Sequence, residues 1–276
     1  MVVTIHFVGF HPTLIYGGFE KIRVEYPIER VYLLYDGKQD RYGAVSRYNV
    51  KRLANVLSFF KPILIAVNPL IPRNVFSKIY AILKIEREEG KEVLLDVTDM
   101  PPIAASVASV AAAMLENVVI YSVLSEQRGE FIPDPSTPDF EGWIEKKDSN
   151  VAKDVIEIPL TSMSRREFDE QKDIEKKILT VLYERNGSAD SIKTLIEWCS
   201  CDSHNPVIKA QFSRAIADLE ERGLVKRIYK GKRRGVSLTE TGMALIEAER
   251  LIPEIKKRIT DAFSRPASLL ITEHTL

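Results

Sequence analysis

Five short, uninterrupted apolar runs in the first half of the chain constrain its fold more than any other feature. They are rich in β-branched residues and cover 2–8, 31–35, 63–67, 92–97 and 118–124. A strand buried on both faces has this continuous pattern, whereas a strand with one solvated face alternates apolar and polar residues. Helical stretches separate the runs at about 12–25, 45–60, 72–90 and 101–116. This alternation predicts an α/β domain with a doubly wound, mostly parallel, Rossmann-like sheet.

The residues beyond 124 break this alternation. Prolines, glycines and charged residues are frequent between 125 and 154, which we interpret as a loop or linker. A last strand is predicted at 155–160, and the periodicity is helical from residue 169 on. The sequence therefore predicts a first domain at 1–160, a linker at 161–168 and a second domain at 169–276.

Charge and cysteine content limit the classes of function. The 276 residues include 39 Lys and Arg and 39 Asp and Glu, so the net charge is zero. This balance argues against a wholly basic nucleic-acid binder but not against a local basic patch. The two cysteines, Cys199 and Cys201, do not make a disulfide framework. No apolar run is long enough for a membrane span, and the first residues lack the pattern of an export signal. We therefore expect a cytoplasmic protein without a membrane partner.

The second domain shows amphipathic helical segments separated by turn residues. The periodicity predicts helices at 170–184, around 192–198, from 206 to about 222 and at 241–263. Ser188 or Asp190 is placed to cap the second of these helices, and Pro206 suits the first turn of the third. Two β-prone runs around Gly231 predict a hairpin, and six basic residues with no acidic residue lie between 226 and 234. This order of elements predicts a winged helix-turn-helix domain.

The same segment resembles the MarR-type winged-helix pattern. The resemblance rests on Ser213-Arg214, on residues 219–225, on the hairpin tip at 231–234 and on Ser237-Leu238-Thr239-Glu240-Thr241-Gly242. The turn before the third helix is longer than the usual three to four residues, which is a departure from the pattern.

Polar and basic side chains on the third helix and the hairpin predict contact with double-stranded DNA. A polar helix fits the major groove, where each base pair displays its own donors and acceptors, and a basic hairpin reaches phosphates or the minor groove. The candidate DNA-binding residues are Lys209, Gln211, Ser213, Arg214, Lys230, Lys232, Arg233 and Arg234. The alternative is a winged helix that contacts protein, with a solvated basic loop.

The last helix predicts the state of assembly. Its apolar residues at 241–263 suit dimerisation, and a two-fold dimer matches a palindromic DNA site. The alternative is that this helix packs back on its own module.

Two strand ends in the first domain predict a ligand site. In an open α/β sheet, ligands bind beyond the carboxyl ends of the strands, where the strand order reverses. The candidates there are Gly9, Phe10, His11, Pro12 and Thr13 after the first strand, and Asp96, Thr98, Asp99 and Met100 after the fourth. Neither G-x-G-x-x-G after the first strand nor a P-loop motif is present, so dinucleotide and nucleoside-triphosphate sites of those types lose support. The alternative role for the Asp96, Thr98 and Asp99 side chains is to cap the following helix.

The combination of these domains resembles the CRISPR-associated Rossmann-fold (CARF) regulators of archaea. The matching residues are Gly9-Phe10-His11-Pro12 and Asp96-Val97-Thr98. The resemblance implies that these two loops line a pocket across a dimer axis and that the ligand belongs to the cyclic oligoadenylate class. The family usually has Lys or Arg shortly after its Asp-x-Thr motif, whereas this chain has Asp99-Met100-Pro101-Pro102.

We therefore expect a homodimeric, ligand-responsive transcription regulator that senses a small nucleotide-like ligand. An alternative from the same resemblance is a ring nuclease that cleaves cyclic oligoadenylate, with Thr13, Thr98 and His11 as the residues to test. A third is a protein-interaction adaptor. We expect no cofactor and no metal, because Cys199, Cys201 and His204 fall short of the four well-spaced ligands of a typical zinc site.

Overall fold

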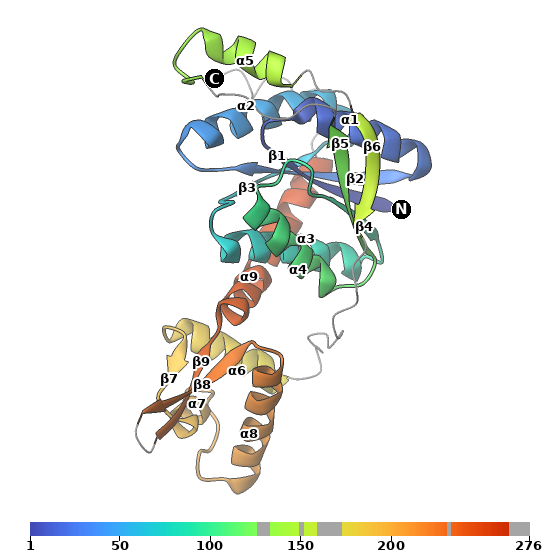
Figure 1. Ribbon diagram of the computed structural model, residues 1–276. Coiled ribbons are helices and arrows are strands. Elements are labelled where there is room, and N and C mark those ends of the chain that lie inside the picture. Colours follow the sequence, from blue (N-terminus) through green and yellow to red (C-terminus); the bar gives the residue numbers. More distant parts are fainter. Residues whose placement is uncertain (126–132, 149–151, 159–172, 231–232, 265–276) are drawn as a thin grey trace. The chain divides into compact units, whose positions relative to one another are not determined.

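The computed structural model describes residues 1–125, 133–148, 152–158, 173–230 and 233–264 (Figure 1). The chain forms two compact units, one made of Met1–Met163 with Ile252–Leu276 and the other of Ser164–Leu251. This differs from the prediction that 169–276 form a single domain, because the chain returns to the first unit after residue 251. The predicted linker at 161–168 lies outside the described residues.

The first unit is built on one sheet. Its strands are β1 (Val2–Val8), β2 (Ile28–Asp36), β3 (Ile63–Val67), β4 (Glu92–Asp96), β5 (Val118–Ser125) and β6 (Ala152–Ile158). In the described residues the order is β3-β2-β1-β4-β5-β6, with β1 to β5 parallel and β6 antiparallel to β5. The prediction of a doubly wound, mostly parallel, Rossmann-like sheet is therefore confirmed.

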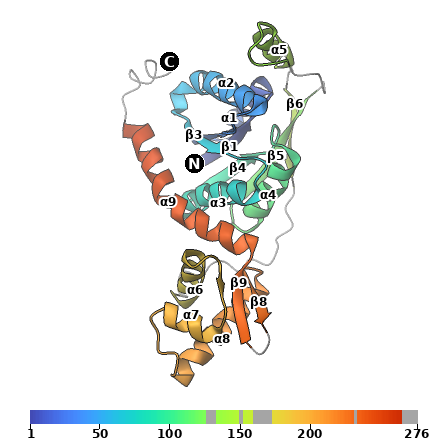
Figure 2. The same cartoon turned by 90° about the vertical axis from the view of Figure 1, so that its left-hand side faces the viewer.

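Helices cover both faces of this sheet. They are α1 (Pro12–Glu25), α2 (Arg41–Val56), α3 (Pro72–Glu88) and α4 (Pro102–Ala113), with a short 3-10 turn η1 (Ser58–Phe60). Figure 2 shows α1 and α2 on one face and α3 and α4 on the other. The second helix begins four residues earlier than predicted, because the Asp40 side chain caps it by accepting from the Gly43 amide (2.8 Å).

The interpretation of 125–154 as a loop or linker is wrong in its second half. Residues Asp139–Lys147 form a helix, α5. Acidic residues occupy its first turn and lysines its last, which suits the helix dipole, and Phe140 and Ile144 are buried one turn apart. The sequence did not predict this helix, because the prolines that precede it dominate the local composition.

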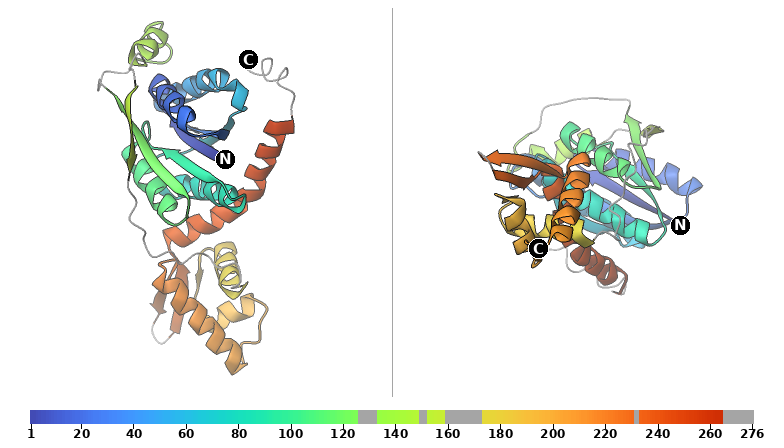
Figure 3. Two further views of the ribbon diagram at one scale, coloured as in Figure 1. Left: turned by 90° about the vertical axis from the view of Figure 1, so that its right-hand side faces the viewer. Right: turned by 90° about the horizontal axis from the view of Figure 1, so that it is seen from below.

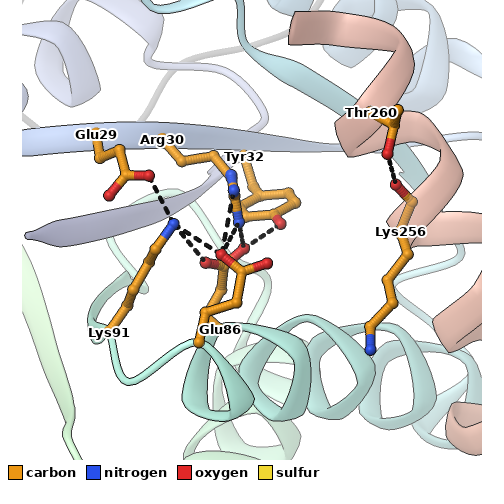
Figure 4. A network of polar contacts seen from close by, with 8 residues as sticks. Glu29, Arg30, Tyr32, Glu86, Lys91, Lys256 and Thr260 are labelled. Carbon is orange, nitrogen blue, oxygen red and sulfur yellow. Dashed lines mark hydrogen bonds and ion pairs between the residues drawn. The ribbon is translucent and has the colours of Figure 1, made fainter.

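A buried charge network joins α3 to the sheet at the amino end of β2 (Figure 4). Arg30 donates to the Glu86 carboxylate (2.5 Å), and the Tyr32 hydroxyl donates to the same oxygen. Lys91 bridges Glu29 (2.7 Å) and Glu89 (2.8 Å). Burial, together with the Glu86 carboxylate, raises the pKa of the Tyr32 hydroxyl above its ordinary value. The network balances the charge of a fully buried glutamate.

The end of helix α9 (Glu240–Ser264) completes the first unit. Ile255 and Ile259 are buried, and Lys256 pairs with Glu88 of α3 (2.8 Å). Arg258 donates to the Leu64 carbonyl (3.1 Å), and the Arg30 guanidinium lies 5.6 Å from the centre of the Phe263 ring. The apolar side of this part of α9 is thus covered within the same chain.

The second unit consists of short helices around a small antiparallel sheet. Its elements are α6 (Asp173–Glu184), β7 (Ser188–Ala189), α7 (Ile192–Trp198), α8 (Pro206–Glu221), β8 (Val225–Lys230), β9 (Arg233–Leu238) and the start of α9. The sheet order is β7-β9-β8. Figure 3 shows β8 and β9 projecting as a two-stranded ribbon.

Local capping agrees with the predicted ends of these helices with one exception. Gly187 and Gly223 have φ values of +78° and +67°, the left-handed conformation that ends helices. The cap of α7 is neither Ser188 nor Asp190 but Ser191, whose hydroxyl accepts from the Thr194 amide (3.0 Å). Ser188 and Asp190 were poorer candidates because β7 and its turn occupy the residues before Ser191.

In the part of the chain that the structure describes, no helix has the length and apolar character needed to cross a bilayer.

Helix α1 packs closely against β5 at Gly18, and a substitution at this residue tests that packing. A Cβ atom at this residue would lie 2.3 Å from Cγ2 of the buried Val123 on β5. We expect Gly18→Ala to lower the free energy of unfolding by about 1–3 kcal/mol through overpacking. The matched control is Gly142→Ala on α5, which has open space around it and should gain roughly 0.5–1 kcal/mol from helix propensity. Urea denaturation measures both, and an unchanged midpoint for Gly18→Ala would contradict this packing.

Candidate functional site

The candidate ligand site lies where the strand order of the sheet reverses. Strands β1 and β4 are parallel neighbours, and the chain leaves them toward opposite faces, into α1 and α4. This is the position at which α/β sheets hold ligands. The structure therefore places the two predicted loops, 9–13 and 96–100, side by side at one edge of the sheet.

Asp99 ties the two loops together. Its Oδ2 accepts from the backbone amides of Gly9 (2.7 Å) and His11 (2.9 Å), and its Oδ1 accepts from the His11 imidazole Nδ1 (2.9 Å). A carboxylate oxygen can only accept, so Nδ1 of His11 carries the proton in this contact. The Asp99 side chain is 5% exposed. Its role is to fix the β1 loop.

Asp96 and Thr98 turn inward rather than toward solvent. One Asp96 oxygen accepts from the Thr98 amide (2.9 Å) and hydroxyl, and the other faces Nδ1 of the buried His6 (3.0 Å). The Thr98 hydroxyl in turn accepts from the Val123 amide (2.7 Å). These contacts join the ends of β1, β4 and β5. The alternative that these side chains cap α4 is wrong, because Pro101 is its cap residue and, among the described residues, the side chains of Asp96, Thr98 and Asp99 bond instead to the β1 loop, to His6, to Val123 and to one another.

Sequence reasoning missed Asp148, which follows α5. Its Oδ1 accepts from the Thr13 amide (2.5 Å), and its Oδ2 accepts from the Thr13 hydroxyl. This carboxylate therefore sits at the amino terminus of α1, where the helix dipole favours negative charge. Burial raises the pKa of Asp148 above its ordinary value. No sequence signal links residues 13 and 148, because the contact depends on a helix that composition concealed.

Three amides of the predicted ligand loop are already used within the chain. Gly9 and His11 donate to Asp99, and Thr13 donates to Asp148. Pro12 has no amide hydrogen to offer. An anionic ligand at this loop would have to compete with two fixed carboxylates.

Aromatic side chains gather beside this loop. The ring of Phe10 lies 5.8 Å from that of Tyr42 on α2 and 6.1 Å from that of Trp143 on α5, both edge to face. Arg41 precedes Tyr42 and pairs with Asp134 (2.7 Å) in an exposed contact. Met100, another candidate ligand residue, is buried.

The candidate DNA-binding residues of α8 lie on its exposed side. Lys209, Gln211, Ser213 and Arg214 are exposed, whereas Phe212 is buried. Among the described residues, neither Lys209 nor Arg214 forms an ion pair. This distinguishes them from two other arginines of the unit, which form the pairs Arg222–Glu175 (2.8 Å) and Arg227–Glu220 (2.9 Å).

The backbones of β8 and β9 form the two strands of the hairpin. In this antiparallel ladder Lys230 lies opposite Arg233, and Tyr229 lies opposite Arg234. Lys232 lies outside the described residues. The structure thus places Lys230, Arg233 and Arg234 at the tip of the projecting ribbon.

The cysteines lie apart from these surfaces. Cys199 is buried at the end of α7, and burial raises the pKa of its thiol to about 11. Cys201 is partly buried and both are free thiols. Within the described ranges, no three His, Cys, Asp or Glu side chains form a group suited to a metal ion.

No protein-family model matches the chain. An uncharacterized protein of Archaeoglobus fulgidus is 26% identical over 228 residues, which cover 80% of this chain and 87% of that one.

Three solved structures show partial structural similarity to the chain. Csm6 of Enterococcus italicus, bound to cyclic hexa-2′-fluoro-hexa-dAMP, gives a TM-score of 0.39 at 11% identity and covers 81% of this chain and 56% of its own. Can2 of Sulfobacillus thermosulfidooxidans, in complex with cyclic tetra-adenylate, gives 0.34 at 12% identity, with 95% and 68% covered. Protein VC1899 of Vibrio cholerae gives 0.36 at 11% identity, with 94% and 68% covered. The chain thus spans little more than half the length of Csm6. The resemblance of the second unit to MarR-type proteins stays a prediction.

Substitution of Asp148 tests its hydrogen bonds to Thr13 in the β1 loop. We expect Asp148→Ala to lower the free energy of unfolding by about 1–3 kcal/mol, because the Thr13 amide loses its acceptor. Asp148→Asn keeps one acceptor oxygen and should cost less. Because burial raises the Asp148 pKa, the folded protein binds this proton more tightly than the unfolded chain.

The wild type should therefore gain stability relative to Asp148→Asn as the pH falls from neutral toward about 4. Urea denaturation of the three proteins across this pH range measures the effect. A wild type that loses stability relative to Asp148→Asn on acidification would contradict the assignment.

Proposed function

We propose that the protein is a ligand-responsive, DNA-binding transcription regulator. The observation that carries the proposal is the exposed face of α8, with two cations that have no acidic partner among the described residues, in the same unit as a basic hairpin. The second unit has the element order of a winged helix-turn-helix, in which three helices precede a hairpin and a further helix.

The shape of α8 supports its role as a recognition helix. Its first half is exposed on most sides, including Val207, Ala210 and Arg214. Small alanines let a helix approach the base edges closely, and arginine and glutamine supply donors for guanine and adenine. The acidic residues of α8, Asp218, Glu220 and Glu221, all lie in its last turn, away from this half.

The hairpin supports contact with the DNA backbone. Lys230 lies opposite Arg233 in the β8–β9 ladder, and residues 226–234 contain no acidic residue. Lys226 and Tyr229 are exposed on the same ribbon. Contacts of such groups to phosphate position a protein on DNA without reading sequence. This charge pattern favours DNA over the alternative of a protein-binding winged helix.

Gel shift with pooled genomic fragments across a salt series tests this proposal. We expect binding at low salt, and the double variant Lys209→Ala/Arg214→Ala should weaken it. Each of the two cations that meets a phosphate should also reduce the salt slope by about 0.9. The matched control is Lys176→Ala, an exposed lysine of α6. Absence of binding by the wild type at low salt would refute the proposal.

We further propose that the β1 and β4 loops of the first unit sense a nucleotide-like ligand. Support comes from their place at the reversal of strand order and from the short motifs shared with CARF regulators. A ligand there changes DNA binding only if its affinity differs between two arrangements of the protein. We favour sensing over ring cleavage, because the Thr13 and Thr98 hydroxyls already donate to Asp148 and Asp96.

Helix α4 supports a homodimer. Its twelve residues contain no charged side chain, and Ile103 and Val110 are exposed at 51% and 48% with Val107 between them. A second copy of this helix is the occupant that suits such a face. The tail helix suits dimerisation less well, since Ile255 and Ile259 are buried within the chain. Because α4 follows the β4 loop, a two-fold axis at α4 brings two candidate sites together.

A charge on α4 tests the dimer. We expect Val110→Glu to convert a dimer into a monomer in sedimentation velocity, because an unpaired charge would be buried in the interface. Val24→Glu places the same charge on an even more exposed valine of α1 and should leave the dimer intact. A dimer that persists in Val110→Glu would exclude α4 as the interface.

A further inference from the structure

We propose that Phe10, Tyr42 and Trp143 form a stacking subsite for a nucleobase, with Arg41 as the cation for the attached phosphate. This inference rests on the proposed sensing function and deepens it. It names the part of the ligand that is recognised and residues outside the two predicted loops.

The three rings come from separate elements and meet beside the β1 loop. Phe10 lies in that loop, Tyr42 in the first turn of α2 and Trp143 on α5. The planes of Tyr42 and Trp143 make angles of 79° and 88° with that of Phe10. Both outer rings therefore stand edge to face against the central one. Val45 and Ile144 form the apolar floor of the cluster.

Tyr42 offers an accessible ring. It is 58% exposed, although its neighbour Gly43 and the following Val45 are buried. Base stacking on an aromatic side chain contributes about 1–3 kcal/mol, and every base has a flat face that can stack. An exposed tyrosine backed by two further rings suits a purine.

Trp143 has an unmet hydrogen bond. Its indole Nε1 is buried and has no hydrogen-bond partner within the described residues. A buried tryptophan N–H usually finds an acceptor, and leaving one unpaired costs about 1–3 kcal/mol. Purine ring nitrogens are acceptors of the kind that this N–H lacks.

The charges around the cluster suit a phosphate at Arg41. Its pair with Asp134 is exposed on both sides, and such a pair contributes little stability, so a phosphate can replace it. Asp40 is engaged by Lys38 (2.6 Å) and by the Gly43 amide. Asp99 is likewise engaged by the β1 loop. At this subsite a phosphate therefore competes with one exposed carboxylate, Asp134, whereas an anion at the loop amides meets two carboxylates that are held by the loop itself.

Tryptophan fluorescence gives the test, because the chain has two tryptophans, Trp143 and Trp198. In the full-length Trp198→Phe variant, Trp143 is the single reporter. We expect adenosine monophosphate and cyclic tetra-adenylate to change its emission, and ribose 5-phosphate, which lacks a base, to leave it unchanged. Titration calorimetry measures the affinities in parallel.

Substitution of the exposed ring completes the experiment. Tyr42→Ala should weaken binding of the adenine compounds by roughly 5- to 150-fold, and Tyr42→Phe should retain it. Phe59→Ala, which removes an aromatic ring that is 88% exposed outside the cluster, is the matched control. Circular dichroism verifies that each variant is folded.

Two results would overturn the inference, and only the second would also refute the proposed sensing function. Adenine compounds that bind by calorimetry with unchanged Trp143 emission and unchanged affinity in Tyr42→Ala would remove the subsite and leave the sensing function standing. Absence of binding by every compound in calorimetry would remove both.

Discussion

Burial of β1 on both faces is the constraint from which the rest of the first unit follows. All seven of its residues are buried, including the polar Thr4 and His6. A strand in that position requires helices on either side of the sheet, so the chain leaves β1 and β4 in opposite directions. The loops that follow β1 and β4 therefore lie side by side at the carboxyl ends of these strands, and no chain connection in the described residues crosses between them. The candidate site is a geometric result of burying the central strand, and the side chains of the loops decide what it binds.

The polar side chains of the two loops form their hydrogen bonds within the protein itself. Asp99 and Asp148 accept from the loop amides and from Thr13, while Asp96 and Thr98 satisfy each other beneath them. A rigid loop of this kind is held in one conformation before any ligand arrives, which lowers the entropic cost of recognition. It also leaves the loop with few free donors for phosphate. Recognition by stacking beside the loop is consistent with both properties.

Much of the first unit was predictable from the sequence, because its strands are continuous apolar runs and its helices have a clear periodicity. The strand at 63–67 and the helix at 12–25 were predicted to the residue. Helix α5 was missed because prolines outweigh its short pattern, and with it the contacts of Trp143 and Asp148. Pairings across more than a hundred residues, such as Thr13 with Asp148, leave no trace in local composition. In the second unit, the α7 cap shifted to Ser191 because a short strand occupies the preceding residues.

The course of the chain through the two units bears on how such a protein can evolve. The polypeptide enters the first unit at its start and again at Ile252, so the second unit is an insertion in the sequence of the first rather than an appendage. Exchange of the second unit by recombination therefore requires two crossovers, the later one within the codons of α9. Loss of the codons from Ile252 on would remove Ile255 and Ile259 from the first unit, whereas a simple tandem fusion would tolerate that loss.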